Sequence, residues 1–176
     1  MELKNILPTP LETTEQPSEA EWAECEAKLT RLPPDYKSFL EDYGTGCIDG
    51  FIWIFNPSSQ NPNLNLLVQV KRQLSALDEL IQQKTESKIY PLYPEIAGLL
   101  PFGITDNGDV LFWKTMGTPE NWSVVVGNSR SPEYQEFQIS MTSFIASVLN
   151  GTKRVAAFPE DFPNSSPSFK PYRHSI

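Results

Sequence analysis

Histidine and cysteine, the residues most used in nucleophilic and metal sites, are almost absent from this chain of 176 residues. There is one histidine, His174, close to the C-terminal end, and there are two cysteines, Cys25 and Cys47. Two cysteines are too few for a disulfide framework or a zinc site, so we expect both to be reduced thiols. A Cys47/His174 pair would need the chain end to be held within hydrogen-bond reach of the thiol. The sequence therefore predicts no catalytic residue, no metal ligand and no cofactor.

Long apolar runs and phosphate-binding motifs are also missing. No apolar stretch approaches the roughly 20 residues of a membrane span, and no P-loop or Gly-x-Gly-x-x-Gly motif occurs. The N-terminal residues lack the cationic start and apolar stretch of a signal peptide. Asp106 and Asp109 lack the spacing of an EF-hand, and a hairpin turn accounts for them without an ion. We expect a cytoplasmic protein that does not bind membranes.

Basic residues are fewer than acidic ones: the chain has 14 Lys and Arg and 22 Asp and Glu, which gives a formal net charge of −8. Residues 1–30 alone carry seven acids against two bases. A phosphate backbone rewards clustered Lys and Arg, so nucleic acid is not the expected partner. An acidic protein suits a basic protein partner, because opposite charges steer association. The alternative is that the charge serves only solubility.

What the sequence does contain is a helix whose two ends are both marked. Between Leu32 and Gly46, Pro33 and Pro34 suit a first helical turn, and Gly44 suits the exit from a helix. Four apolar residues between these ends recur at helical spacing and form a stripe that we expect to be buried: Tyr36, Phe39, Leu40 and Tyr43.

Three further helices are predicted. Ser18 and Glu21 form a capping box for a helix of about three turns. An apolar stripe indicates a long amphipathic helix that ends near residue 85: Leu67, Val70, Leu74, Leu77 and Ile81. We expect this stripe to be core. Thr142 is predicted to cap a last helix that Gly151 ends.

Strand patterns indicate a largely antiparallel sheet. The expected strands are 51–55, 99–105, 110–114, 122–127 and 135–139. Asn107-Gly108 predicts a hairpin with a type I′ turn. The fold class is therefore α+β, with an antiparallel sheet of about five or six strands and helices packed mainly on one side.

The domain organisation follows from length and composition. A chain of this length favours a single domain over residues 1–176. We expect residues 1–16 to form an irregular arm, residues 17–151 the core, and residues 152–176 a tail rich in proline and aromatic residues. Aromatic residues at this density need burial, so we expect the tail to lie over the domain; the alternative is a free interaction arm.

The ordered set of motifs resembles the SUKH superfamily, the domains similar to the Smi/Knr regulators of fungal cell walls. The resemblance covers roughly residues 20–150. Its motifs are the helix that begins with Leu32-Pro33-Pro34-Asp35-Tyr36, the strand from Phe51, Leu100-Pro101-Phe102-Gly103, Asn107-Gly108-Asp109, Leu111 with Trp113, Trp122-Ser123-Val124-Val125, and Thr142-Ser143-Phe144. It implies a SUKH-like fold and a non-catalytic role in binding other proteins.

Stand-alone bacterial members of that superfamily look like immunity proteins that neutralise polymorphic or contact-dependent toxins, nucleases among them. The resemblance therefore implies a cognate toxin domain as the partner, and the acidic balance of this chain suits a basic surface on that domain. The alternative is a regulatory interaction domain of the cell-wall-synthesis-regulator type. Exposed acids with an aromatic anchor would make the interface, because charges speed encounter and buried aromatics slow dissociation. The candidate partner-binding residues are Glu41, Asp42, Asp49, Trp53, Asp106, Asp109 and Trp113. The competing assignment is that these acids cap turns and that the tryptophans belong to the core.

Overall fold

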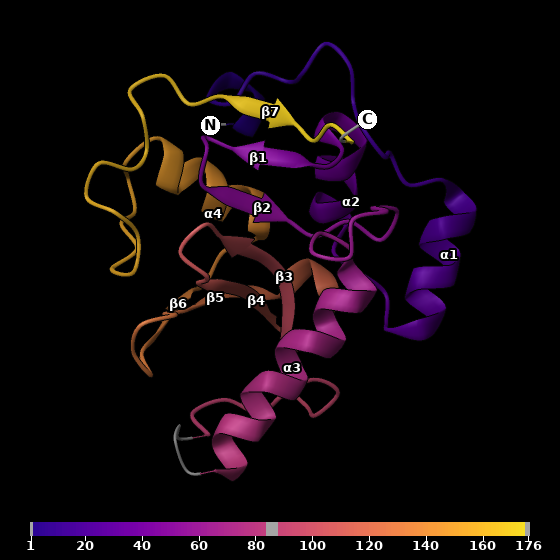
Figure 1. Cartoon of the computed structure of the whole chain (residues 1–176), viewed down its shortest axis with the longest axis vertical. Coiled ribbons are helices and arrows are strands. Elements are labelled where there is room, and N and C mark those ends of the chain that lie inside the picture. The colour runs from indigo at the N-terminus through magenta and orange to yellow at the C-terminus, as the bar shows by residue number, and fades with distance from the viewer. Residues whose placement is uncertain (1, 84–87, 175–176) are drawn as a thin grey trace.

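The computed structural model describes residues 2–83 and 88–174, which form an antiparallel sheet with helices on both faces (Figure 1). This part of the chain contains four α-helices and two 3-10 turns. The helices are α1 (Glu19–Lys28), α2 (Pro34–Tyr43), α3 (Leu66–Gln82) and α4 (Met141–Leu149), and the turns are η1 (Leu3–Asn5) and η2 (Pro119–Asn121). None of the described helices is both long and apolar enough to cross a membrane.

The described strands form one sheet in the order β6-β5-β4-β3-β2-β1-β7, and every neighbouring pair is antiparallel. The strands are β1 (Gly46–Ile48), β2 (Ile52–Ile54), β3 (Leu99–Thr105), β4 (Val110–Lys114), β5 (Ser123–Gly127), β6 (Tyr134–Phe137) and β7 (Phe169–Pro171). The α+β class is confirmed. The described residues provide seven strands where the sequence predicts five or six. The two strands that the sequence analysis does not include, β1 and β7, have three residues each.

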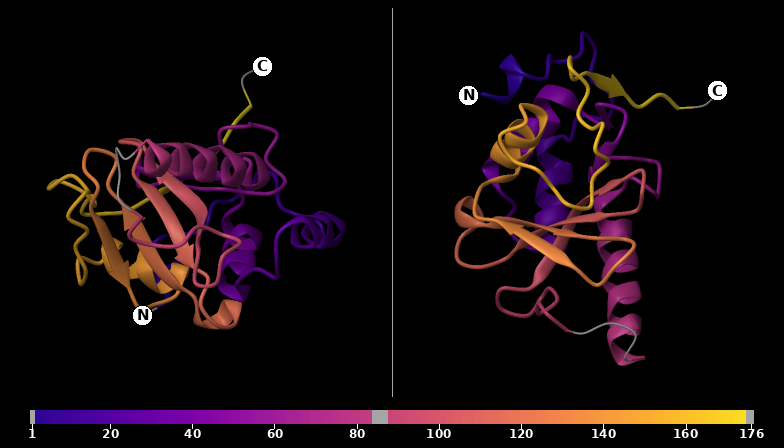
Figure 2. Two further views of the ribbon diagram at one scale, coloured as in Figure 1. Left: turned by 90° about the horizontal axis from the view of Figure 1, so that it is seen from below. Right: turned by 90° about the vertical axis from the view of Figure 1, so that its left-hand side faces the viewer.

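The strands alternate their side chains between two apolar layers. Figure 2 shows α2 and α4 on one face of the sheet and α3, a helix of 17 residues, on the other, so helices cover both faces. The residues that pack in the smaller layer with Leu77 of α3 are Leu99, Phe112 and Val125. The residues of the same strands that point into the main core are Leu100, Leu111, Trp113, Val124 and Val126.

Helix α2 buries the stripe that its spacing predicts. Tyr36 and Leu40 are 0% exposed and Phe39 is 2% exposed. The Tyr36 hydroxyl donates to the Phe55 carbonyl at 2.6 Å, and the Tyr36 ring lies edge-on to Trp113 with centroids 4.9 Å apart. The helix starts at Pro34 and is followed by Gly44 with φ 65°. The predicted ends and the predicted face of this helix are both confirmed.

The hairpin between β3 and β4 differs from the type I′ turn that Asn107-Gly108 predicts. Only Gly108 of these two residues has positive φ, at 86°. The Gly108 N–H donates to the Thr105 carbonyl, and the Thr105 N–H donates to the Asp109 carbonyl, both at 2.9 Å. This is the three-residue hairpin loop in which a left-handed glycine follows a type I turn. The longer loop places Asp106 at the tip of the turn.

The two ends of the described chain lie near the same edge of the sheet (Figure 1). In the N-terminal arm Leu7 is fully buried, and its carbonyl accepts from the Tyr43 hydroxyl at 2.6 Å. In the tail, β7 pairs with β1, and the ring of Phe169 lies 5.2 Å from that of Tyr43. His174 Nε2 lies 3.0 Å from Glu15 Oε1, which joins the tail to the arm.

Three predicted helix ends can be compared with the structure. The capping box of Ser18 and Glu21 is confirmed. The predicted cap at Thr142 is wrong: Ser140 caps α4, and Thr142 instead donates its backbone N–H and its hydroxyl to Asp35 Oδ2. Helix α3 ends at Gln82, and residue 85, where the sequence predicts its end, lies outside the described residues.

Candidate functional site

Three of the seven predicted partner-binding residues are buried and are removed from the candidate surface. The exposed fractions of Asp49, Asp109 and Trp113 are 5%, 1% and 1%. Trp113 lies in the main core with its ring 4.8 Å from that of Phe102. These three side chains are therefore not available as surface contacts, and the competing assignment to turns and core describes them.

The two buried carboxylates are held by polar groups of the chain itself. Asp49 accepts from the backbone N–H of Asn164 at 2.7 Å and from its side-chain amide at 2.9 Å. Asp109 accepts from the Thr105 hydroxyl at 2.8 Å and from the Ser129 N–H at 2.9 Å. Buried carboxylates with such partners stabilise loops, so they have a structural role.

Trp53 and Asp106 remain accessible, and the structure brings them together. Trp53 lies on β2, is half-buried, and donates from Nε1 to Asp106 Oδ1 at 2.8 Å. The Asp106 backbone N–H donates to the Phe51 carbonyl at 3.0 Å, which fixes the turn against β2. The carboxylate therefore holds the indole ring in one orientation at the surface.

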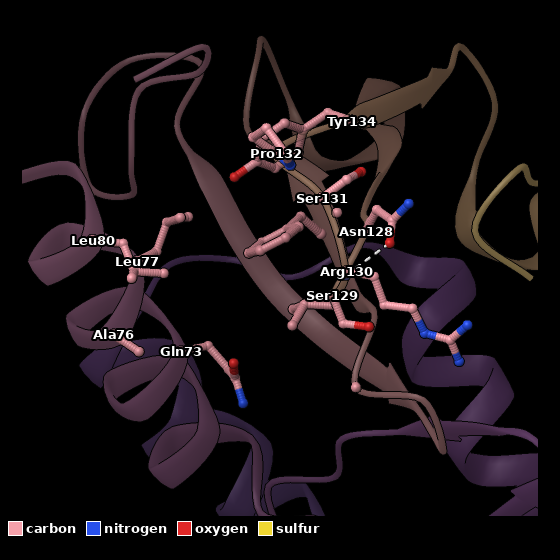
Figure 3. Close-up of a pocket in the computed structure, with 14 residues that line it drawn as sticks. Gln73, Ala76, Leu77, Leu80, Asn128, Ser129, Arg130, Ser131, Pro132 and Tyr134 are labelled. Atoms are coloured by element: carbon pink, nitrogen blue, oxygen red, sulfur yellow. Dashed lines mark hydrogen bonds between the residues drawn. The ribbon is translucent and has the colours of Figure 1, made fainter. Parts of the chain in front are cut away.

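This pair lies at one end of a groove between α3 and the sheet. The groove consists of two hollows, of about 410 Å³ and about 310 Å³, that share Gln73. The first is lined by Trp53, Asn61, Asn63, Leu64, Gln69, Arg72, Gln73, Ile104, Thr105, Asp106 and Tyr172. The second, shown in Figure 3, is lined by Gln73, Ala76, Leu77, Leu80, Gly108, Val110, Phe112, Gly127, Asn128, Ser129, Arg130, Ser131, Pro132 and Tyr134. We call the two hollows together the α3 groove.

The sequence did not predict the α3 groove because the stripe of α3 was assigned to the core. Val70 is buried, at 6% exposed, whereas Leu67, Leu74, Leu77 and Ile81 are only half-buried. Leu80, beside this stripe, is 40% exposed. Gln73, Ala76, Leu77 and Leu80 recur at helical spacing, so the broadening of the stripe toward Leu80 was the signal that could have indicated a second face.

Glu41 and Asp42 lie elsewhere, on α2 and thus on the opposite face of the sheet. Asp42 Oδ1 is 2.8 Å from Lys4 Nζ, and this hydrogen bond raises the pKa of Lys4. Glu41 is exposed. Beside them is a hollow of about 560 Å³, the α2 hollow, lined by Glu2, Leu3, Lys4, Asp35, Ser38, Phe39, Asp42, Tyr43, Thr142 and Ser143. The predicted acids therefore belong to two separate surfaces.

The two residues considered for nucleophilic catalysis have the following surroundings. Cys47 lies on β1 and is 5% exposed, and the ring of His174 packs edge-on against Tyr172. Among the described residues no group of three His, Cys, Asp or Glu side chains is placed to hold a metal ion. Asp106 and Asp109, which the sequence places in one turn, bind different partners, Trp53 and Thr105.

Both cysteines are expected to be unreactive in the native protein. Burial raises the pKa of the Cys25 thiol to about 11 and that of the Cys47 thiol to about 12. Because the thiolate is the reactive form, a disulfide reagent at about pH 8 should label neither residue before the protein unfolds and should label both in guanidinium chloride. Mass spectrometry of the two reactions checks this, and rapid labelling of the native protein would contradict the buried positions.

A family described as SMI1-KNR4 cell-wall (SUKH_6) matches residues 19–145 of the chain. The match extends from the start of α1 into α4, so it includes both walls of the α3 groove. It ends before β7. No curated protein and no solved structure matches the chain.

Proposed function

Because the chain belongs to the SMI1-KNR4 cell-wall family of SUKH domains, we propose that it acts by binding another protein and performs no catalysis. In this proposal it is a cytoplasmic immunity protein. Its partner is a toxin domain with a basic surface, which it neutralises by forming a one-to-one complex.

The observation that carries the proposal is the acidic α2 hollow. Three carboxylates, those of Glu2, Asp35 and Asp42, line this hollow together with a single ammonium group, that of Lys4. Glu41 adds an exposed carboxylate beside it. Such a surface favours encounter with Lys and Arg side chains and raises the association rate.

Fast association driven by opposite charges also suits a protein that inhibits a toxin by covering its functional surface. A protein that neutralises a toxin must bind it faster than the toxin acts, and electrostatic attraction can raise association rates to about 10⁸–10⁹ M⁻¹s⁻¹ at low salt. Many toxins act on nucleic acid and need a basic surface for it, so an acidic protein can cover that surface. Affinity would then depend on the buried contacts at its centre.

The experiment that tests the proposal starts with capture of the partner from the native cell. The captured polypeptide should be basic, should arrest growth when it is produced alone, and should become harmless when this chain is produced with it. Capture of a cell-wall enzyme whose activity the chain changes would support the regulatory alternative, which the family description favours. A captured partner that is harmless and unrelated to the wall would refute both.

Reversing the charges of Glu41 and Asp42 to Lys should slow association with the captured toxin about tenfold at low salt. The salt dependence of the association rate should also flatten, because the steering charges are removed. The melting temperature should change little, since an exposed ion pair such as Asp42 with Lys4 contributes about 0–1 kcal/mol. Stopped-flow mixing at several salt concentrations measures the rate.

The matched control is the double reversal of Glu160 and Asp161 to Lys, which changes the net charge equally on another exposed segment. This control should slow association much less. Equal slowing by both double variants would mean that only net charge matters, and the α2 hollow would then be excluded from the interface.

A further inference from the structure

We propose that the α3 groove binds an extended polypeptide segment in which a large apolar side chain is flanked by carboxylates. This goes beyond the proposed function, because the groove lies on the other face of the sheet from the α2 hollow and has a different chemistry. The segment would come from a protein that binds the chain independently of the basic toxin partner.

The groove stays open because its two walls carry small residues. Ala76 on α3 is exposed and, with Gly127 on β5, lines the hollow shown in Figure 3. A Cβ atom at Gly127 would come within 3.2 Å of ring atoms of both Phe112 and Tyr134, so a side chain there would crowd the floor of the groove. With no side chain at this point, the ring of Phe112 forms an apolar floor.

The apolar wall on α3 is incompletely covered by the chain. Leu77 is half-buried and Leu80 is 40% exposed. The hollow they line has a volume of about 310 Å³, near the lower end of the roughly 300–1,000 Å³ typical of ligand pockets. A large apolar side chain from a partner would remove this surface from water, which stabilises a complex by about 25 cal/mol per Å² of apolar area buried.

The charged residues of the groove determine which side chains are favoured next to the apolar side chain of the bound segment. Its charged lining residues are Arg72, Arg130 and Asp106. Arg72 donates to the neutral amide oxygen of Asn63 at 2.9 Å, and within the described residues neither guanidinium forms an ion pair. Asp106 already accepts from Trp53. Two unneutralised guanidinium groups in a protein of net charge −8 favour carboxylates on the bound segment, because guanidinium and carboxylate pair in a planar, two-pronged geometry.

The Trp53 end of the groove supplies a rigid aromatic surface. Its indole is held by the hydrogen bond to Asp106, so little side-chain entropy is lost when a partner packs on it. Tryptophan and arginine are the residues that contribute most to binding energy at interfaces. The groove thus combines an apolar pocket, a fixed indole on β2, one arginine on α3 (Arg72) and one in the loop between β5 and β6 (Arg130).

Two labelled nine-residue peptides test the proposal on the full chain. One has a central phenylalanine flanked by glutamates, and the other has lysines in place of the glutamates. Fluorescence anisotropy should show the glutamate peptide binding at least about tenfold more tightly than the lysine peptide, with an affinity that weakens as salt is added. Equal affinities, tighter binding of the lysine peptide, or no binding of either would overturn the proposal.

Variants then place the binding in the groove. Ala76→Trp should fill the pocket and weaken binding of the glutamate peptide at least about tenfold, whereas Ser75→Trp, one residue along on the exposed side of α3, should not.

Arg72→Glu with Arg130→Glu should remove the preference for the glutamate peptide, while the matched reversal of Lys153 and Arg154 should leave it intact. Equal effects of the paired variants would overturn the assignment. The Glu41 and Asp42 reversal should not change peptide binding, so failure here is distinguishable from failure of the proposed toxin interface.

Discussion

Replacing Tyr36 by Ala is expected to lower the free energy of unfolding by about 3–5 kcal/mol, the range for removal of a large aromatic side chain from a core. Tyr36 is 0% exposed and lies between two indole rings, with ring centroids 5.7 Å from Trp22 and 4.9 Å from Trp113. The substitution also leaves the buried Phe55 carbonyl without its hydrogen-bond donor. The loss is large beside the roughly 5–15 kcal/mol that stabilises a folded protein.

Urea unfolding followed by circular dichroism measures this effect. Because Tyr36→Ala can fail to fold, Tyr36→Phe serves as the graded variant: it keeps the ring, unpairs the Phe55 carbonyl, and should cost about 1–3 kcal/mol. Ser38→Ala is the control, since Ser38 is exposed on the same helix and should change stability by less than about 0.5 kcal/mol. A loss below about 1 kcal/mol for Tyr36→Ala would contradict its place at the centre of the core.

Removing residues 152–176 is expected to abolish cooperative unfolding. This segment supplies β7, the partner of β1, and it contributes aromatic rings to two places in the core. Phe158 and Phe162 pack on Phe51 with ring centroids 5.2 and 4.9 Å away. Without β7, β1 becomes an open edge of the sheet. Without Phe158 and Phe162, the ring of Phe51 is exposed to water, and both changes favour aggregation.

Point substitutions separate the contribution of β7 from that of the whole tail. Phe169→Ala should lower the free energy of unfolding by about 2–3 kcal/mol, less than a fully buried Phe because this side chain is half-buried. Lys170→Ala is the control, because Lys170 is exposed on the same strand. Thermal unfolding and size-exclusion chromatography measure stability and association. A truncated chain that stays monomeric and melts at the same temperature would show that the tail does not contribute to the fold.

Much of the architecture was predictable because its signals are local. The two prolines, the apolar stripe and Gly44 describe α2 within twelve residues, and hydrogen bonds between neighbours in sequence decide where a helix begins. The capping box at Ser18 is local in the same way: Ser18 N–H donates to Glu21 Oε2 at 2.8 Å. The error at Thr142 shows the limit, because two residues suited to capping lie close together and a contact with Asp35, 107 residues away, engages one of them.

The candidate site was less predictable because exposure is decided by distant partners. Asp49 and Asp106 are both acids near turns, and nothing in their local sequence distinguishes them. Asn164, 115 residues farther along the chain, buries Asp49, whereas Asp106 stays at the surface beside Trp53. The α3 groove likewise depends on which strand faces Ala76, and a helical period cannot show how completely a neighbouring element covers a stripe.

The sequence by itself determined the helices, the principal strands, the α+β class and the family, because periodicity, capping residues and turn residues act over a few positions. Only the tertiary structure decided which carboxylates and tryptophans reach the surface, that the tail completes the sheet, and that α3 leaves a groove above Phe112. Those outcomes depend on contacts between residues far apart in the chain. A polar or aromatic side chain is stable either in water or inside the protein with its partners, so its position follows from the fold and not from its neighbours in sequence.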